Sequence, residues 1–229
     1  MSRLVGLLTA VTLVAVFISA CDTAHTVAPA PPVAPAATSP EAAVKVLEWG
    51  FNNRNVDAIA GLLPEGCSLE SAELDTAGDS VVTDVWRRQD LLATFNAMFN
   101  GDTGAPAASK LRMNLGENLV AFPDDRPGRS GGIHRAVRSS LDVEVVTGEG
   151  NVYRPEGHLL CYVTRGDSAM IPPELVARGV QADSTRWWID RIEDETTSSH
   201  SRPGLHTTPS NVWSFGEVLL FWHHGPPRP

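Results

Sequence analysis

The chain has 229 residues, of which 42% are hydrophobic, and 27 acidic against 18 basic residues give it a formal net charge of −9. This acidic balance disfavours nucleic acid and anionic lipid headgroups as partners, because both require a basic surface. Once the N-terminal segments described next are set aside, about 190 residues remain, which is enough for one domain with a substantial core.

The N-terminus has the pattern of a secretory signal. Arg3 precedes an uncharged apolar run over residues 4–18, which at roughly 15 residues is shorter than the ~20 that a membrane-spanning helix needs. The following Ile18-Ser19-Ala20-Cys21 resembles the lipobox of bacterial lipoproteins, in which the cysteine receives diacylglycerol. We therefore predict a signal peptide over residues 1–20 and lipidation at Cys21. The alternative is an ordinary signal peptide with a chance cysteine at its end.

The predicted lipid anchor determines the expected location. Acyl chains contribute about 0.8 kcal/mol per buried methylene, so a lipidated Cys21 would hold the protein on the extracytoplasmic side of a cell membrane. Asp22 resembles the signal that retains lipoproteins at the inner membrane of diderm bacteria. Loss of Arg3 with the signal peptide would leave a mature net charge of −10. The membrane is thus an expected partner through the anchor, and nucleic acid is not.

A tether is predicted after the anchor. The segment after Cys21, DTAHTVAPAPPVAPAATSP, is rich in Ala and Pro and has no aromatic residue, so it cannot bury a core. We assign residues 21–38 to a lipidated tether and residues 39–229 to one domain with a C-terminal extension over residues 198–229.

Three helices are predicted at the start of the domain. Ser39 is the expected N-cap of the first, Pro40 its first residue, and apolar residues recur at helical spacing up to Phe51. A second helix is expected over 56–63 behind an Asn55 cap, and a third over 88–100. Glycine at position 101 is a typical helix terminator.

The second half of the chain has the patterns of strands. Alternating or β-rich apolar runs predict strands over 141–145, 159–164, 187–192 and 218–222, and the segments 121–132 and 196–209 are expected to be loops. Helices that precede strands in this way indicate an α+β fold with helices packed on an antiparallel sheet.

Two segments resemble the NTF2-like superfamily, which includes the SnoaL-like cyclases and the ketosteroid isomerases. They are SPEAAVKVLEWGFNNRNVDAIAGLLPEGC, with Asp57 in a D-x-x-A-x-x-L pattern, and RWWIDRIEDE. The resemblance implies a cone in which three N-terminal helices pack on a curved antiparallel sheet. The chain departs from the compact family layout over 110–137 and after residue 195, where residues 211–224 are expected to add a strand.

The resemblance also implies a place for catalytic groups. Enzymes of this family hold an acid or base inside the cone, and the isomerases use a first-helix tyrosine that this chain lacks. Asp84, Asp90 and Asp190 are the acidic residues placed to approach a cavity. If Trp188 and Ile192 face inward, strand alternation puts Asp190 inward too. We favour the alternative, a surface Asp190 paired with an arginine such as Arg165, and predict no catalytic residue.

An aromatic ligand pocket is the alternative to simple core packing for the six tryptophans. The candidate pocket residues are Trp49, Trp86, Tyr162, Trp188 and Asp190. Cys67 and Cys161 are candidates for a disulfide, with two separate buried thiols as the alternative. The seven histidines form no metal-binding motif, and no phosphate-binding or nucleotide-binding glycine pattern occurs, so no metal or cofactor is expected.

Two functional hypotheses follow. The first is a membrane-anchored, non-catalytic binding or scaffolding module for a small apolar ligand or a cell-envelope protein. The second is an enzyme of the cyclase, dehydratase or isomerase kind that uses a buried aspartate. The absence of a first-helix tyrosine and of an acid/base motif favours the first hypothesis.

Overall fold

The computed structural model describes residues 32–74, 80–102, 105–166, 171–181, 183–196 and 213–224. The helices and strands described below all belong to one unit, Ala34–Pro229. The predicted signal peptide, Cys21 and Asp22 lie outside the described residues. Among those that are described, no helix is long and apolar enough to cross a membrane.

The three predicted N-terminal helices are present. Helix α1 spans Pro40–Asn52, and the Ser39 hydroxyl caps it by accepting a hydrogen bond from the Ala42 amide. Helix α2 is shorter than predicted, Val56–Ala60, and Asn55 caps it in the same way. Helix α3 spans Arg88–Asn100 and ends at Gly101, which has a positive φ of 78°. The predicted capping residues therefore located the starts of α1 and α2 correctly.

The strands form one curled sheet in the order β2-β1-β8-β7-β5-β3, with β4 and β6 also paired to β5. The strand bounds are β1 Ser68–Leu74, β2 Ser80–Arg87, β3 Lys110–Asn114, β4 Val120–Pro123, β5 His134–Val146, β6 Val152–Tyr153, β7 Glu156–Arg165 and β8 Trp187–Asp194. The α+β class is as predicted. The sheet is mixed, however. Strand β1 runs parallel to β8, whereas the other strand pairs are antiparallel.

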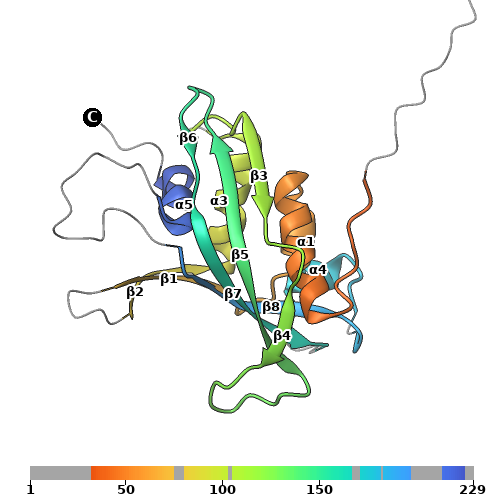
Figure 1. Cartoon of the computed structure of the whole chain (residues 1–229). Coiled ribbons are helices and arrows are strands. Elements are labelled where there is room, and N and C mark those ends of the chain that lie inside the picture. Colours follow the sequence, from red (N-terminus) through yellow and green to blue (C-terminus); the bar gives the residue numbers. More distant parts are fainter. Residues whose placement is uncertain are drawn as a thin grey trace, which may run out of the picture. The chain divides into compact units, whose positions relative to one another are not determined.

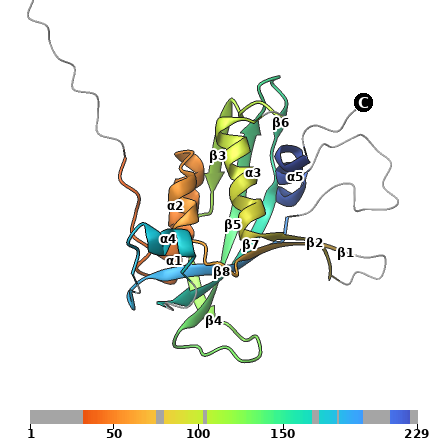
Figure 2. The same cartoon turned by 180° about the vertical axis from the view of Figure 1, so that it is seen from behind.

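One face of the sheet, here called the inner face, carries the main core. Helices α1, α3 and α5 lie against it (Figures 1 and 2). Leu69, Val143, Cys161 and Ile192 point to this face from four strands, and all are buried in one hydrophobic cluster. The opposite side, the outer face, carries the residues that alternate with them along each strand. The curled sheet with helices on its inner face fits the expected cone arrangement.

The C-terminal extension contains a helix where a strand was predicted. Helix α5 spans Phe215–His224, so the assignment of a strand to Val218–Trp222 was wrong. Ser214 and Glu217 form a capping box, in which the Ser214 amide donates to the Glu217 carboxylate at 2.7 Å and the Glu217 amide donates to the Ser214 hydroxyl at 3.1 Å. A short apolar run alone does not distinguish a buried strand from a buried helix, and here the cap and the tertiary packing decide.

Three further assignments need correction. Helix α4, Pro173–Ala177, was not predicted, and the loop expected over 121–132 contains most of strand β4. The domain also begins before Ser39. Ala37 is buried in the main core, and its carbonyl accepts a hydrogen bond from the Trp187 amide at 2.8 Å. The last residues of the predicted tether therefore belong to the folded unit.

Helix α1 seals the sheet edge formed by β3 and β4. The Asn52 side-chain amide accepts from the Met113 amide at 2.7 Å and donates to the Met113 carbonyl at 2.8 Å, as a neighbouring strand would. The Glu41 carboxylate accepts from the Ala121 amide at 3.2 Å. These contacts satisfy backbone groups that an unpaired edge strand would leave exposed.

Candidate functional site

A β-bulge in β8 places Asp190 on the outer face. Tyr162 of β7 pairs with Arg191 and the next residue, Val163, pairs with Ile189, so Asp190 is the extra residue without a partner. The bulge interrupts strand alternation, which explains why Ile189 and Ile192 both lie in the main core although they are three residues apart. The prediction that Trp188, Asp190 and Ile192 share one face was therefore wrong.

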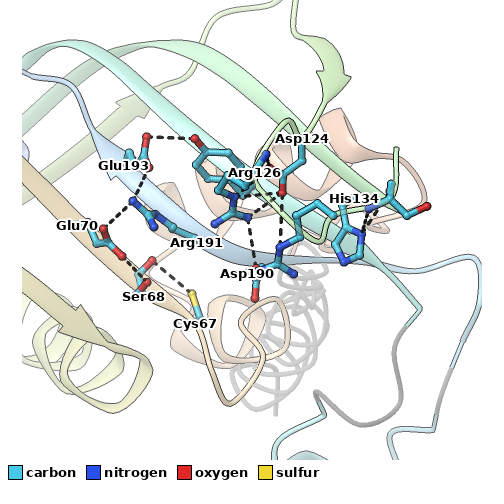
Figure 3. Close-up of polar contacts among 12 residues, drawn as sticks. Cys67, Ser68, Glu70, Asp124, Arg126, His134, Asp190, Arg191 and Glu193 are labelled. Carbon is cyan, nitrogen blue, oxygen red and sulfur yellow. Dashed lines mark hydrogen bonds and ion pairs between the residues drawn. The ribbon is translucent and has the colours of Figure 1, made fainter. Parts of the chain in front are cut away.

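Asp190 is held by two arginines of the loop between β4 and β5. Its Oδ2 lies 2.9 Å from Nη2 of Arg129 and 3.6 Å from Nη2 of Arg126, and only 12% of its side chain is exposed. The expected pairing with an arginine is thus observed, but the partner is not Arg165, which donates to the Ser184 carbonyl. Figure 3 shows the guanidinium group of Arg126 between the carboxylates of Asp124 and Asp190.

Asp124 anchors this loop. The Arg126 side chain donates to it through Nε, 2.9 Å from Oδ1 and 3.2 Å from Oδ2, and through Nη2, 2.8 Å from Oδ2, and the Arg126 backbone amide donates to Oδ1 at 3.1 Å. Burial alone would raise the pKa of Asp124, but the hydrogen bonds and charge of Arg126 and the charge of Arg129 outweigh it and lower the pKa. Asp124 is therefore a carboxylate at neutral pH and is poorly suited to be a general base.

Tyr162 connects this loop with a second group of charges on β1 and β8. The guanidinium carbon of Arg126 lies 3.8 Å from the centre of the Tyr162 ring, and the Tyr162 hydroxyl donates to Glu193 at 3.3 Å. Arg191 bridges Glu193 at 2.6 Å and Glu70 at 2.7 Å. Burial and the charge of Glu193 raise the pKa of Tyr162, although Arg126 and Arg191 oppose this. We call these charged residues and Tyr162 the outer polar cluster (Figure 3).

The outer polar cluster is almost charge-balanced. Its members are Glu70, Asp124, Arg126, Arg129, Tyr162, Asp190, Arg191 and Glu193. Its four carboxylates each contact a guanidinium group, and its three arginines each contact carboxylates. Within the described part of the chain, no group of three or more His, Cys, Asp or Glu side chains is placed to hold a metal ion. The cluster is therefore suited to fastening the loop on the sheet.

The predicted pocket residues do not converge. Trp49 is half-buried on α1, Trp86 is buried on the inner face of β2, and Tyr162 and Asp190 belong to the outer polar cluster. Trp188 lies in a separate small hydrophobic cluster with Ile171 and Leu175, and the Arg186 guanidinium stacks on its ring at 4.5 Å. Within the described part of the chain these side chains thus serve different packing regions, as expected for core packing, and they do not meet around one common site.

The two cysteines of the domain are free and buried, so the candidate disulfide is not formed. Cys161 of β7 pairs with Ile192 of β8, which pairs with Leu69 of β1, and Cys67 immediately precedes β1. Two strand spacings of about 4.8 Å separate β7 from β1, so their Cα atoms lie roughly 9.6 Å apart, beyond the ~7 Å limit for a disulfide. Burial raises the pKa of Cys161 to about 12, and both thiols are accordingly unreactive.

Sequence reasoning missed Asp194, a buried carboxylate at the end of β8. Its Oδ1 accepts from the Thr196 amide at 3.0 Å and from the Thr196 hydroxyl at 2.5 Å, and its Oδ2 accepts from the Gly216 amide at 2.8 Å. Burial raises its pKa, and these hydrogen bonds partly oppose the shift.

Sequence reasoning also missed Arg126 and Arg129 of the β4–β5 loop. They had a sequence signal, Asp124-Asp125-Arg126-Pro127-Gly128-Arg129, in which opposite charges flank a turn.

The comparisons with known proteins concern the general architecture alone. No protein-family model and no curated protein matches the chain. Similar solved structures include a Mycobacterium tuberculosis protein of unknown function, with 13% identity, a TM-score of 0.45 and 80% and 83% of the two chains covered. A putative scytalone dehydratase from Novosphingobium aromaticivorans has 15% identity, a TM-score of 0.44 and coverage of 74% and 89%. An NTF2-like superfamily protein from Salmonella enterica has 12% identity, a TM-score of 0.42 and coverage of 73% and 92%.

Proposed function

We propose that the protein is a lipid-anchored, extracytoplasmic binding module that holds a small apolar ligand and performs no catalysis. The anchor part of the proposal rests on the sequence Ile18-Ser19-Ala20-Cys21 behind an apolar signal segment. The binding part rests on the contrast between an aromatic inner face and an outer polar cluster whose carboxylates are all paired. A cell-envelope protein is the other partner that this location would offer.

The aromatic inner face is the observation that carries the binding proposal. Phe51 of α1 contacts Phe95 and Phe99 of α3 and Phe215 of α5, with ring centroids 5.7 to 6.4 Å apart. These rings lie on the three helices that cover the inner face, and an interior rich in aromatic side chains is typical of sites for apolar molecules. In the present arrangement α5 fills this region with its own side chains, so a ligand would have to replace some of them.

The proposal separates into two experiments. Cys21→Ser should abolish incorporation of a fatty-acid analogue and release the protein from the membrane fraction, and labelling of the Ser variant would contradict the anchor. A chain that begins at Pro32 retains Ala37 and the whole main core. It should bind the apolar dye diphenylhexatriene saturably, at one molecule per chain. Dye fluorescence that does not respond to the protein would contradict the ligand part.

An enzyme that uses a buried aspartate is the second candidate function, and Asp194 is the observation that favours it. This carboxylate is 1% exposed, and burial raises its pKa, as an acid or base working near neutral pH requires. Its oxygens accept three hydrogen bonds from Thr196 and Gly216, which instead suits a structural role. Asp194→Asn should therefore lower the melting temperature. A clear rise would support the enzyme, because removing a strained catalytic group stabilises a fold.

A further inference from the structure

Helix α5 is joined to the sheet at its N-terminal end by a close polar contact. The Phe215 amide donates to the Thr196 hydroxyl and the Gly216 amide donates to Asp194, both at 2.8 Å. A Cβ added at Gly216 would lie 2.9 Å from Oγ and 3.2 Å from Cβ of Ser71 on β1, so glycine allows this approach without a shift of Ser71. The two donors and two acceptors are buried, and the joint fixes where α5 leaves the sheet.

The other end of α5 is packed against β2 and α3. Trp222 is buried and its indole nitrogen donates to the Pro106 carbonyl at 3.2 Å. His223 is exposed, its Nδ1 lies 3.2 Å from the Thr94 hydroxyl, and its ring centre lies 4.9 Å from that of Trp86. This end of the helix therefore borders solvent, whereas the joint at Gly216 does not.

An unsatisfied hydrogen-bond donor lies under the exposed end. The Trp86 side chain is 5% exposed, and within the described part of the chain its indole nitrogen has no hydrogen-bond partner. A buried donor without an acceptor is costly, and such groups in a folded protein call for an explanation. An oxygen of a bound molecule would satisfy this donor once the His223 ring has moved aside.

These observations lead to one inference, which rests on the binding function proposed above. We propose that α5 is a movable plug: it pivots on the joint formed by Asp194 and Gly216, withdraws Trp222 and His223, and is replaced by a ligand with an apolar tail and an acceptor head group bound by Trp86. A long-chain carboxylate has this chemistry. Its tail takes over the contacts that Trp222 makes in the main core, and its carboxylate accepts from the indole nitrogen.

If α5 is a movable plug, ligand binding should speed up amide hydrogen exchange in α5, whereas ligand binding commonly slows exchange. When cis-parinaric acid, a fluorescent long-chain carboxylate, binds the chain that begins at Pro32, the amides of residues 219–224 should exchange faster, because α5 has left the sheet. A ligand that simply fills a space beside α5 would slow the same amides. Faster exchange over 219–224 supports the plug, and unchanged or slower exchange in the presence of bound parinaric acid overturns it.

Two substitutions test the closed state and the head-group contact separately. His223→Ala weakens the closed state and should tighten parinaric acid binding roughly fivefold, because more of the protein is open before the ligand binds. His158→Ala is the matched control, since His158 is also an exposed histidine but lies on β7 and not on α5. Trp86→Phe should weaken parinaric acid binding about tenfold while leaving diphenylhexatriene, which has no head group, unaffected.

The outcomes distinguish the plug from the binding function itself. If neither probe binds the wild-type chain or the His223→Ala variant, the binding proposal fails and the plug with it. If both probes bind but His223→Ala and His158→Ala behave alike, binding stands and the plug is overturned. If Trp86→Phe binds both probes like the wild type, the head-group contact is wrong.

Discussion

The two faces of the same sheet are held in different ways. On the inner face, Phe51, Trp222 and their neighbours form a continuous apolar core between the sheet and the helices. On the outer face, Arg126 and Arg129 fasten a loop to Asp124 and Asp190 by charge and hydrogen bonds. The inner face is therefore stabilised mainly by burial of apolar surface, and the outer face by a few ion pairs and hydrogen bonds.

Strand β8 shows how one segment serves both faces. Trp187 packs into the main core, whereas Trp188 packs into the small cluster with Leu175. Two residues later the bulge at Asp190 shifts the alternation so that polar residues meet the outer polar cluster. The difference predicts that substitutions on the inner face will act through packing and those on the outer face through salt and pH.

The largest effect is expected inside the core. Trp222→Ala should reduce the free energy of unfolding by about 3–5 kcal/mol, because it removes a fully buried aromatic side chain and leaves a cavity. Phe221→Ala on the same helix is the control and should cost clearly less, since Phe221 is only half-buried. Urea unfolding measures both. Equal losses would show that the two sides of α5 are packed alike.

A smaller effect is expected from the outer polar cluster. Asp190→Asn should lower the free energy of unfolding by about 1–2 kcal/mol, because the Asp190 side chain is only 12% exposed and the partly exposed guanidinium groups of Arg126 and Arg129 lose a charged partner. Asp142→Asn is the matched control. Its pair with Arg112 is about half exposed, and exposed pairs contribute about 0–1 kcal/mol. Thermal melts in which the two variants are equally stable would place Asp190 among ordinary surface residues.

Low pH is also expected to weaken the outer face and to leave the packing of the inner face unchanged. The pKa of Asp124 is lower in the folded protein than in the unfolded chain, so its contribution to stability is complete above the unfolded value near 3.8 and is lost as the pH falls through the lowered folded value. Asp124→Asn should therefore flatten the decline in melting temperature below pH 4. The control is the apolar variant Trp222→Ala, which should melt lower at every pH with an unchanged acid slope.

Local signals in the sequence predicted local structure well. The caps at Ser39 and Asn55 and the apolar spacing behind them located α1 and α2, because these contacts form within a few residues. The helical character of Val218–Trp222 was missed, since that run is apolar on every side and its state depends on packing against α3. The parallel pairing of β1 with β8 joins segments over 100 residues apart and has no short-range signal.

The candidate site was less predictable for a similar reason. An arginine partner for Asp190 could be expected, but which arginine depended on where the β4–β5 loop folds back. The bulge that turns Asp190 to the outer face is visible only in the pairing of β7 with β8. The two cysteines looked able to pair until the sheet order placed β8 between their strands.

The smallest effect on stability is expected at the N-terminal end of the folded unit, where Ala37 contacts the start of β8. The Ala37 carbonyl accepts from the Trp187 amide at 2.8 Å, at the start of the strand that supplies Trp187 to one face and Trp188 to the other. An acetylated chain that begins at Ser39 should be about 1 kcal/mol less stable than one that begins at Pro32, because a hydrogen bond and a buried alanine are lost. A chain that begins at Ala36 keeps both and should match the longer one. If all three chains melt together, residues 32–38 contribute nothing to the fold and the domain does begin at Ser39.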